Sequence, residues 1–220
     1  MRWTIMSRIC VFAAVLVLSS SFEWKAAAAT YYIRADGGTA AQCTGTADAA
    51  YPGSGNGKPC AWAHPFWALD SSGSWKISAG DTLVIGPGSY MMGFGAPNAG
   101  WCNAPGAFDC CLPPLPSGPA PKTPTRIVGA GWDSGCTQKP ELWGTQRAWQ
   151  IIDLNGTSNA AVECLEINDR SGCVEFHSNA AVRCERDDYP FGDWASRGIV
   201  ASDSASVTLR NLDIHGLASG

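Results

Sequence analysis

The amino-acid sequence predicts an all-β, turn-rich protein. Only 15% of its residues are charged, against about 25% in an average globular protein. The chain also contains 25 glycines and 14 prolines, which supply turns between short apolar segments. These segments alternate apolar and polar residues, as half-buried strands do. A net charge of −4 and the lack of any Lys/Arg cluster make nucleic acid an unexpected partner.

Residues 1–29 are predicted to be a signal peptide. Arg2 and Arg8 give a positive start, residues 9–18 form an apolar run, and the small residues 27–29 resemble an A-x-A cleavage site. The run is shorter than the roughly 20 residues that a membrane-spanning helix needs. We therefore expect a secreted protein, extracellular or periplasmic, with no membrane attachment after cleavage. An uncleaved N-terminal anchor is the alternative.

Cysteine content agrees with export, because secreted proteins keep most cysteines in disulfides. Nine cysteines follow the signal peptide: Cys43, Cys60, Cys102, Cys110, Cys111, Cys136, Cys164, Cys173 and Cys184. Cys43 and Cys60 flank a Gly-rich loop and are expected to form a local disulfide. The four from Cys102 to Cys136 surround a Pro-rich loop and are candidates for two bridges. Nine is odd, so one thiol is left free or pairs outside this segment. Zinc is the rival interpretation, but adjacent cysteines do not match a CxxC ligand pair.

The first part of the mature chain is predicted to contain a strand, a short helix and further strands. Residues 30–35 are typical of a strand. Trp62, Phe66 and Leu69 share one face of a short helix, with Pro65 in its first turn. Strands are expected at residues 82–85 and 126–128, each bounded by glycine turns. Residues 91–124 show little periodicity and form a Cys/Pro-rich insertion.

From residue 149 the sequence repeats a pattern of apolar, acidic and apolar residues. The three copies are residues 152–154, 165–167 and 212–214, and each precedes a polar turn. Alternation places the aliphatic side chains on one face and the acid on the other. In residues 206–216, Val207, Leu209, Leu212 and Ile214 are expected to face inward, with Asn211 at a bend that tolerates left-handed geometry. Stacked short strands of this kind build a coiled sheet; an antiparallel sandwich is the alternative.

Residues 198–216 resemble a rung of the right-handed parallel β-helix proteins of the pectate-lyase-like superfamily. Residues 30–90 are similar to the N-terminal cap of such proteins, which has a strand, a short capping helix and a Gly-Asp-Thr-Leu-Val strand. The resemblance implies an all-β solenoid in which residues 30–220 form the cap and the first coils. Family members carry many coils, whereas this sequence contains two or three. We therefore expect a fragment, or an open end that a partner covers.

The resemblance also implies a function. The superfamily is rich in enzymes that act on acidic polysaccharides, either Ca²⁺-dependent lyases or hydrolases that use clustered carboxylates. A secreted lyase or hydrolase of acidic polysaccharides is therefore expected, with polysaccharide as its partner. A non-catalytic surface or carbohydrate-binding protein is the alternative from a different class.

Five residues are candidates for catalysis. Glu166 and Asp213 occupy equivalent places in their rungs, so they are expected to stack in one outward column. Asp169 and Arg170 directly follow one of these rungs, and His215 follows the other. Carboxylates beside an arginine and a histidine suit acid–base chemistry. The alternative is that these charged side chains only keep the sheet hydrated.

The loop at residues 183–194 is the densest polar and aromatic segment. Asp187 and Asp188 offer hard oxygen ligands to Ca²⁺. Tyr189, Phe191 and Trp194 offer flat faces on which sugar rings can stack. The spacing does not match an EF-hand loop, and a solvated loop fixed by its aromatic residues is the alternative.

Overall fold

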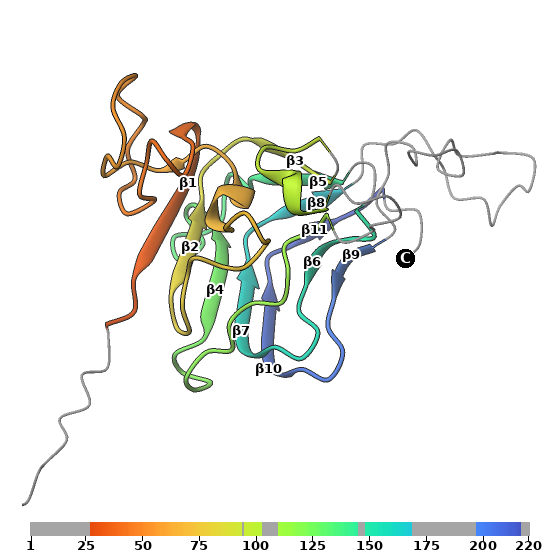
Figure 1. Cartoon of the computed structure of the whole chain (residues 1–220). Helices are drawn as coiled ribbons and strands as arrows, with labels where there is room; N and C mark the ends of the chain where they lie inside the picture. The colour runs from red at the N-terminus through yellow and green to blue at the C-terminus, as the bar shows by residue number, and fades with distance from the viewer. Residues whose placement is uncertain (1–26, 94, 103–109, 145–147, 169–196, 217–220) are drawn as a thin grey trace, which may run out of the picture.

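The computed structural model describes residues 27–93, 95–102, 110–144, 148–168 and 197–216, and within them the protein is all-β with parallel sheets (Figure 1). Sheet 1 has the strand order β1-β2-β4-β7-β10. Its members are β1 (Thr30–Gly38), β2 (Thr82–Ile85), β4 (Thr125–Gly129), β7 (Ser158–Glu163) and β10 (Ala205–Arg210). Every neighbouring pair in this sheet is parallel, so the antiparallel sandwich is excluded for the described residues.

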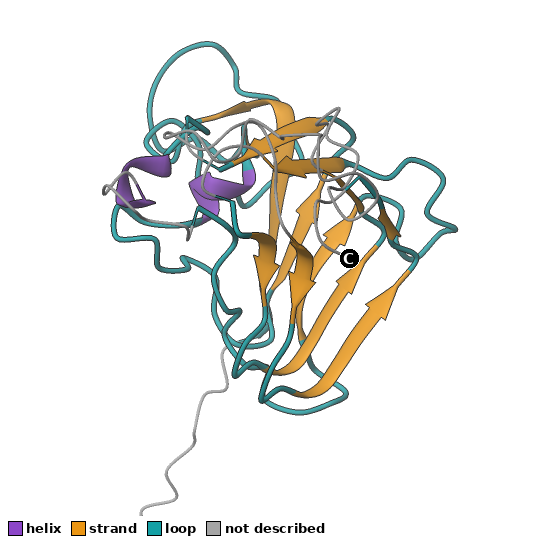
Figure 2. Cartoon of the chain, turned by 90° about the vertical axis from the view of Figure 1, so that its right-hand side faces the viewer, coloured by secondary structure: helices purple, strands orange, loops and turns teal. Residues whose placement is uncertain are grey.

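The described strands form two further parallel sheets. Sheet 2 has the order β11-β8-β5-β3, and sheet 3 pairs β6 with β9. Their strands are β3 (Ser89–Met92), β5 (Glu141–Gly144), β6 (Gln150–Asp153), β8 (Glu166–Asn168), β9 (Arg197–Val200) and β11 (Asp213–Ile214). From β4 to β11 the chain visits sheets 1, 2 and 3 in turn and then repeats that order. Figure 2 shows the strands as a set of arrows, with the short helices gathered to one side.

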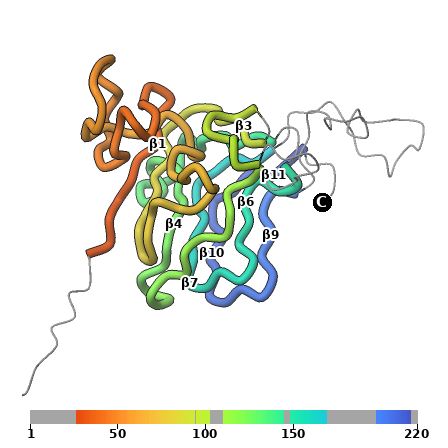
Figure 3. Tube along the Cα trace, viewed as in Figure 1, coloured from red at the N-terminus to blue at the C-terminus, as the bar shows by residue number. Residues whose placement is uncertain are grey.

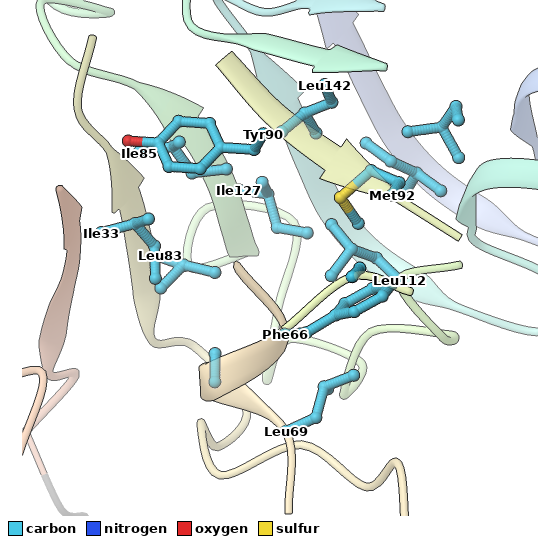
Figure 4. Close-up of a cluster of buried hydrophobic side chains, with 14 of the residues drawn as sticks. Ile33, Phe66, Leu69, Leu83, Ile85, Tyr90, Met92, Leu112, Ile127 and Leu142 are labelled. Atoms are coloured by element: carbon cyan, nitrogen blue, oxygen red, sulfur yellow. The ribbon is translucent and has the colours of Figure 1, made fainter. Parts of the chain in front are cut away.

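The core lies on the inner faces of these sheets. Strand alternation directs one residue in two inward, and in-register pairing stacks inward residues of neighbouring strands on one another. Leu83 of β2 pairs with Ile127 of β4, which in turn pairs with Val162 of β7. All three are fully buried, and Figure 4 shows Leu83 and Ile127 in the cluster that the strands surround.

The two edges of sheet 1 differ. Residues 39–63 lie against the outer edge of β1, where the Tyr32 amide donates to the Gly45 carbonyl (2.8 Å) and the Gly38 amide to the Ala61 carbonyl (3.0 Å) (Figure 3). Gly45 has a φ of +77°, and a Cβ there would lie 2.7 Å from the Trp62 ring, so only glycine fits. At the opposite end, the inward-facing Leu209 and Ile214 are 49% and 46% exposed.

A short 3₁₀ helix, η1 (Pro65–Ala68), contributes Phe66 to the core, and a second one, η2, spans Ala99–Cys102. His64 is the N-cap of η1: its Nδ1 accepts from the Phe66 amide (3.1 Å). Its Nε2 then carries the proton and donates to the Met91 carbonyl (2.9 Å). The helix predicted from Trp62, Phe66 and Leu69 is thus present as a single 3₁₀ turn, with Pro65 at its start.

Among the described residues, disulfides join three pairs of cysteines: Cys43–Cys60, Cys102–Cys110 and Cys136–Cys164. The local Cys43–Cys60 bridge is confirmed. Cys136 bonds Cys164, which follows β7, rather than a cysteine of the Pro-rich loop. The prediction of two bridges within the group from Cys102 to Cys136 was therefore wrong. Sequence spacing did not reveal this pair, because the two cysteines are 28 residues apart and only the pairing of strands brings them together.

In the described part of the chain no helix is long and apolar enough to cross a membrane.

The expected strands at residues 30–35, 82–85 and 126–128 are all present, the first and third being longer than predicted. Three strands were not anticipated: β3, β5 and β7. β3 lies partly inside the segment that showed little periodicity, and β7 has alanine at two neighbouring positions, Ala160 and Ala161, which carry a weak strand signal. Asn211 has a φ of 55°, as expected for the bend before β11.

We predict that His64 makes the protein less stable in acid. His64 is 4% exposed, and burial lowers the pKa of its imidazole to about 4. The unfolded chain therefore binds this proton more readily than the folded protein, so stability is lost as the pH falls from about 6.5 to 4, by about 3 kcal/mol. Urea denaturation across this pH range measures the slope.

His64→Asn is the matched variant, because asparagine can still accept from the Phe66 amide but does not titrate. The variant should lose this part of the pH dependence even if its stability at neutral pH is lower. An equal pH slope in both proteins would contradict the assignment.

Candidate functional site

Three carboxylates form a column on the outer face of sheet 2, which we call the carboxylate ladder: Glu141, Glu166 and Asp213. Glu141 of β5 pairs in register with Glu166 of β8, and Glu166 with Asp213 of β11. The residues that follow them on these strands, Leu142 and Ile167, are fully buried, so alternation turns the acids outward. Strands lie about 4.8 Å apart, which places three like charges on successive rungs.

Glu166 is the central member of the ladder and makes two further contacts. Its Oε1 lies 3.0 Å from Nε2 of His215. The same oxygen accepts from Nδ2 of Asn168 at 3.3 Å, and that nitrogen also donates to Oε1 of Glu141 at 2.9 Å. One amide group therefore holds two carboxylates side by side, while an imidazole that can carry a proton contacts one of them.

Asp213 has a cation as its partner. Lys139 Nζ donates to Asp213 Oδ2 at 2.8 Å, and this contact holds the pKa of the Asp213 carboxyl below its ordinary value. Asp213 therefore remains ionised at neutral pH. The ladder thus combines a carboxylate fixed in its charged form with a neighbouring carboxylate that touches an imidazole, which is an arrangement suited to acid–base chemistry.

A second outward column runs beside the ladder and is less polar. Met91 pairs with Trp143, and Trp143 with Asn168. Trp143 is half-buried, so the indole lies next to the carboxylates on the same sheet face. An aromatic ring beside charged and amide groups is the usual composition of a surface that binds sugars, because the ring covers the C–H face of the sugar while the polar groups bind its hydroxyls.

Asn168 is 4% exposed, and its Oδ1 has no hydrogen-bond partner among the described residues. A buried amide oxygen without a partner carries a desolvation cost, and active sites are common places for such groups. Among the described residues no three His, Cys, Asp or Glu side chains converge in a way that would hold a metal ion. The ladder is a column of carboxylates, two of which share the Asn168 amide as a hydrogen-bond donor.

The sequence-predicted site is only partly described. Glu166, Asp213 and His215 are brought together as expected. Asp153 lies on β6 in sheet 3, away from the ladder's sheet. The remaining predicted residues lie outside the described ones: Asp169, Arg170, Asp187, Asp188, Tyr189, Phe191 and Trp194. Their roles in catalysis, calcium binding and substrate binding stay predictions.

Sequence reasoning missed Glu141, Lys139 and Asn168. A signal for Glu141 was present: it precedes Leu142 as Glu166 precedes Ile167 and Asp213 precedes Ile214. The other two copies begin with a leucine, whereas this one has Pro140 at that position. The apolar-acidic-apolar pattern is therefore broken, and the strand was not recognised. Lys139 gave no signal at all, because only the paired strands bring it to Asp213, 74 positions later.

A second group of charges lies on sheet 1 and is structural in character. Glu163 is 2% exposed, and its carboxylate accepts from Arg126 Nη1 (2.7 Å) and from Arg210 Nε (2.7 Å). The Arg126 guanidinium also lies 5.0 Å from the centre of the Trp132 ring. These bonds link β4, β7 and β10 and leave Glu163 too enclosed to meet a substrate.

Comparison with known proteins gives no relative: the chain matches no protein family model, no curated protein and no solved structure at a significant level. The site must therefore be interpreted from its own geometry.

We predict that replacing Lys139 by methionine raises the pKa of Asp213 toward its ordinary value, because the ammonium that favours the charged carboxylate is removed. The carboxyl ¹³C chemical shift of Asp213, followed through an acid titration by NMR, measures this change. Lys122→Met removes an exposed lysine elsewhere and should leave the titration unchanged. If both variants titrate like the unmodified protein, the Lys139–Asp213 ion pair does not exist in solution.

Proposed function

We propose that the described strands are the opening coils of a right-handed parallel β-helix. The recurring order of sheets 1, 2 and 3 supports this, because each pass adds one parallel strand to each sheet. The segment that covers the outer edge of β1 fits the role of an N-terminal cap. Three disulfides and the signal-like residues 1–29 support secretion to an oxidising compartment.

We propose that the protein is a secreted, polysaccharide-hydrolysing enzyme and that the carboxylate ladder is its active site. The observation that carries this proposal is the in-register pair Glu166 and Asp213, with His215 on the first carboxylate and Lys139 on the second. Glycoside hydrolysis uses two carboxyl groups, one as proton donor and one as base or nucleophile. The ladder offers two such groups in different surroundings.

The roles follow from those surroundings. Lys139 keeps Asp213 ionised, so Asp213 serves as the nucleophile or base. Glu166 serves as the acid–base group, since it contacts His215, through which a proton can exchange with solvent. Strands on neighbouring rungs lie about 4.8 Å apart, so carboxyl groups that extend in parallel from paired positions would be separated by nearer the roughly 5–5.5 Å of retaining enzymes than the roughly 6.5–9.5 Å of inverting ones. We therefore expect retention of anomeric configuration.

A hydrolase is favoured over a lyase. A uronate lyase needs an unprotonated base beside an acidified proton, and among the described residues Lys139 is held at Asp213 as an ammonium group. Both an acidic polysaccharide and the carboxylates of the ladder are negatively charged, so a cation such as Ca²⁺ between them would favour binding. We thus propose that calcium would bind together with an acidic substrate, between its carboxylates and those of the ladder, rather than stay bound to the free protein.

The test is a substrate screen. The purified protein is incubated with pectate, alginate and neutral plant and microbial polysaccharides, with calcium or with EDTA, and both reducing ends and unsaturated-uronate absorbance are measured. We expect reducing ends without unsaturated products. Glu166→Gln and Asp213→Asn should each lower kcat by about 100-fold or more, because each removes an acid–base group but keeps the shape of the side chain.

Asp153→Asn is the control, since Asp153 belongs to the same sequence pattern but lies on sheet 3. It should leave kcat unchanged. Unsaturated products would indicate a lyase instead. A folded protein that binds polysaccharides but releases no product from any of them would favour the non-catalytic binding protein.

A further inference from the structure

A hollow of about 520 Å³ lies on the outer face of sheet 1, at the capped end of the molecule. Tyr32 and Arg34 line it from β1, Val84 from β2, and Pro87 and Asp48 from the loops around them. Alternation explains its composition: Ile33 points into the core, as Figure 4 shows, so its two neighbours on β1 point outward. The hollow is on a different sheet from the carboxylate ladder.

A network of three charged side chains forms the polar wall of the hollow. Arg34 makes a two-pronged contact with Asp36, through Nε to Oδ1 (2.8 Å) and Nη2 to Oδ2 (3.0 Å), and its Nη1 donates to Asp48 Oδ1 (3.0 Å). These bonds hold the guanidinium rigidly and lower the pKa of the Asp36 carboxyl. Two of the five guanidinium N–H groups and the second Asp48 oxygen take no part in this network and can bind a ligand.

The remaining wall is apolar and aromatic. Tyr32 and Val84 are both half-buried on the same face, and Pro87 is exposed beside them. The Tyr32 hydroxyl makes no hydrogen bond to any described residue, so the phenol presents both a flat ring and a polar tip to the hollow. The hollow therefore has an apolar and aromatic side and a polar side, and the polar side carries the hydrogen-bond donors of Arg34 and the acceptors of Asp48.

We propose that this hollow is a binding site for neutral saccharides, separate from the ladder. A pyranose presents the same two kinds of surface: a C–H face that packs on an aromatic ring, and a rim of hydroxyls that each donate and accept. The wall supplies N–H donors and carboxylate acceptors side by side, which matches adjacent hydroxyl groups. The volume lies within the range of small-ligand sites, about 300–1,000 Å³.

The charge of the wall selects among sugars. Arg34 is opposed by both Asp36 and Asp48, so the group carries one net negative charge. A uronate would bring a further negative charge to this wall and bind more weakly than its neutral counterpart. The site would thus hold a neutral sugar unit, whether or not the ladder is catalytic.

The experiment is an NMR titration of the ¹⁵N-labelled protein with neutral tetrasaccharides of glucose, xylose and mannose, and with a galacturonate oligomer. At least one neutral oligosaccharide should shift the amides of residues around Tyr32, Arg34 and Asp48 in a saturable way, and the galacturonate should shift them less. Tyr32→Ala should weaken binding about tenfold, as loss of an aromatic packing surface does.

Asp48→Asn is a second variant that conserves shape, and it should weaken binding while leaving the fold intact. Glu166→Gln is the matched control, because it alters the ladder and should leave these shifts unchanged. Three results would overturn the proposal: no saturable shift with any neutral oligosaccharide, tighter binding of galacturonate, or unchanged binding in a folded Tyr32→Ala protein.

Discussion

Parallel, in-register pairing is the constraint on which the other features of this protein depend. Each strand places its inward residue above the inward residue of its neighbour, so Leu83, Ile127 and Val162 form one buried stack. The outward residues are forced into columns by the same geometry. A one-residue shift of any strand would bury its charges and expose its aliphatic residues. Core packing and the placement of surface chemistry are therefore set by one choice of register.

Because outward residues stack in columns, side chains of like charge can lie next to one another. The protein offsets the resulting repulsion in two ways. Glu163 is enclosed by two arginines from the strands on either side, which fixes the order of β4, β7 and β10. On sheet 2 the carboxylates have different partners: Lys139 binds Asp213, Glu141 and Glu166 share one amide donor, and Glu166 also contacts His215. Carboxylates in different surroundings can have different proton affinities, which acid–base chemistry requires.

Much of the fold could be predicted from the sequence because its signals are local. The strand at 82–85 and the bend at Asn211 follow from alternation and from the backbone preferences of asparagine. The pair Glu166 and Asp213 followed from a repeated pattern. Lys139, Asn168 and the Cys136–Cys164 bond were missed for a shared reason: each depends on which strands are neighbours, and short strands with alanine or proline at key positions do not reveal it.

The segment that covers β1 limits where sheet 1 can accept a further strand. Backbone groups of β1 are already bound by residues 39–63, through the Tyr32 amide to Gly45 and the Gly38 amide to Ala61. An incoming strand, from another copy of this chain or from another protein, would have to displace these bonds before it could pair with β1. The covering segment therefore protects this edge against strand-to-strand aggregation.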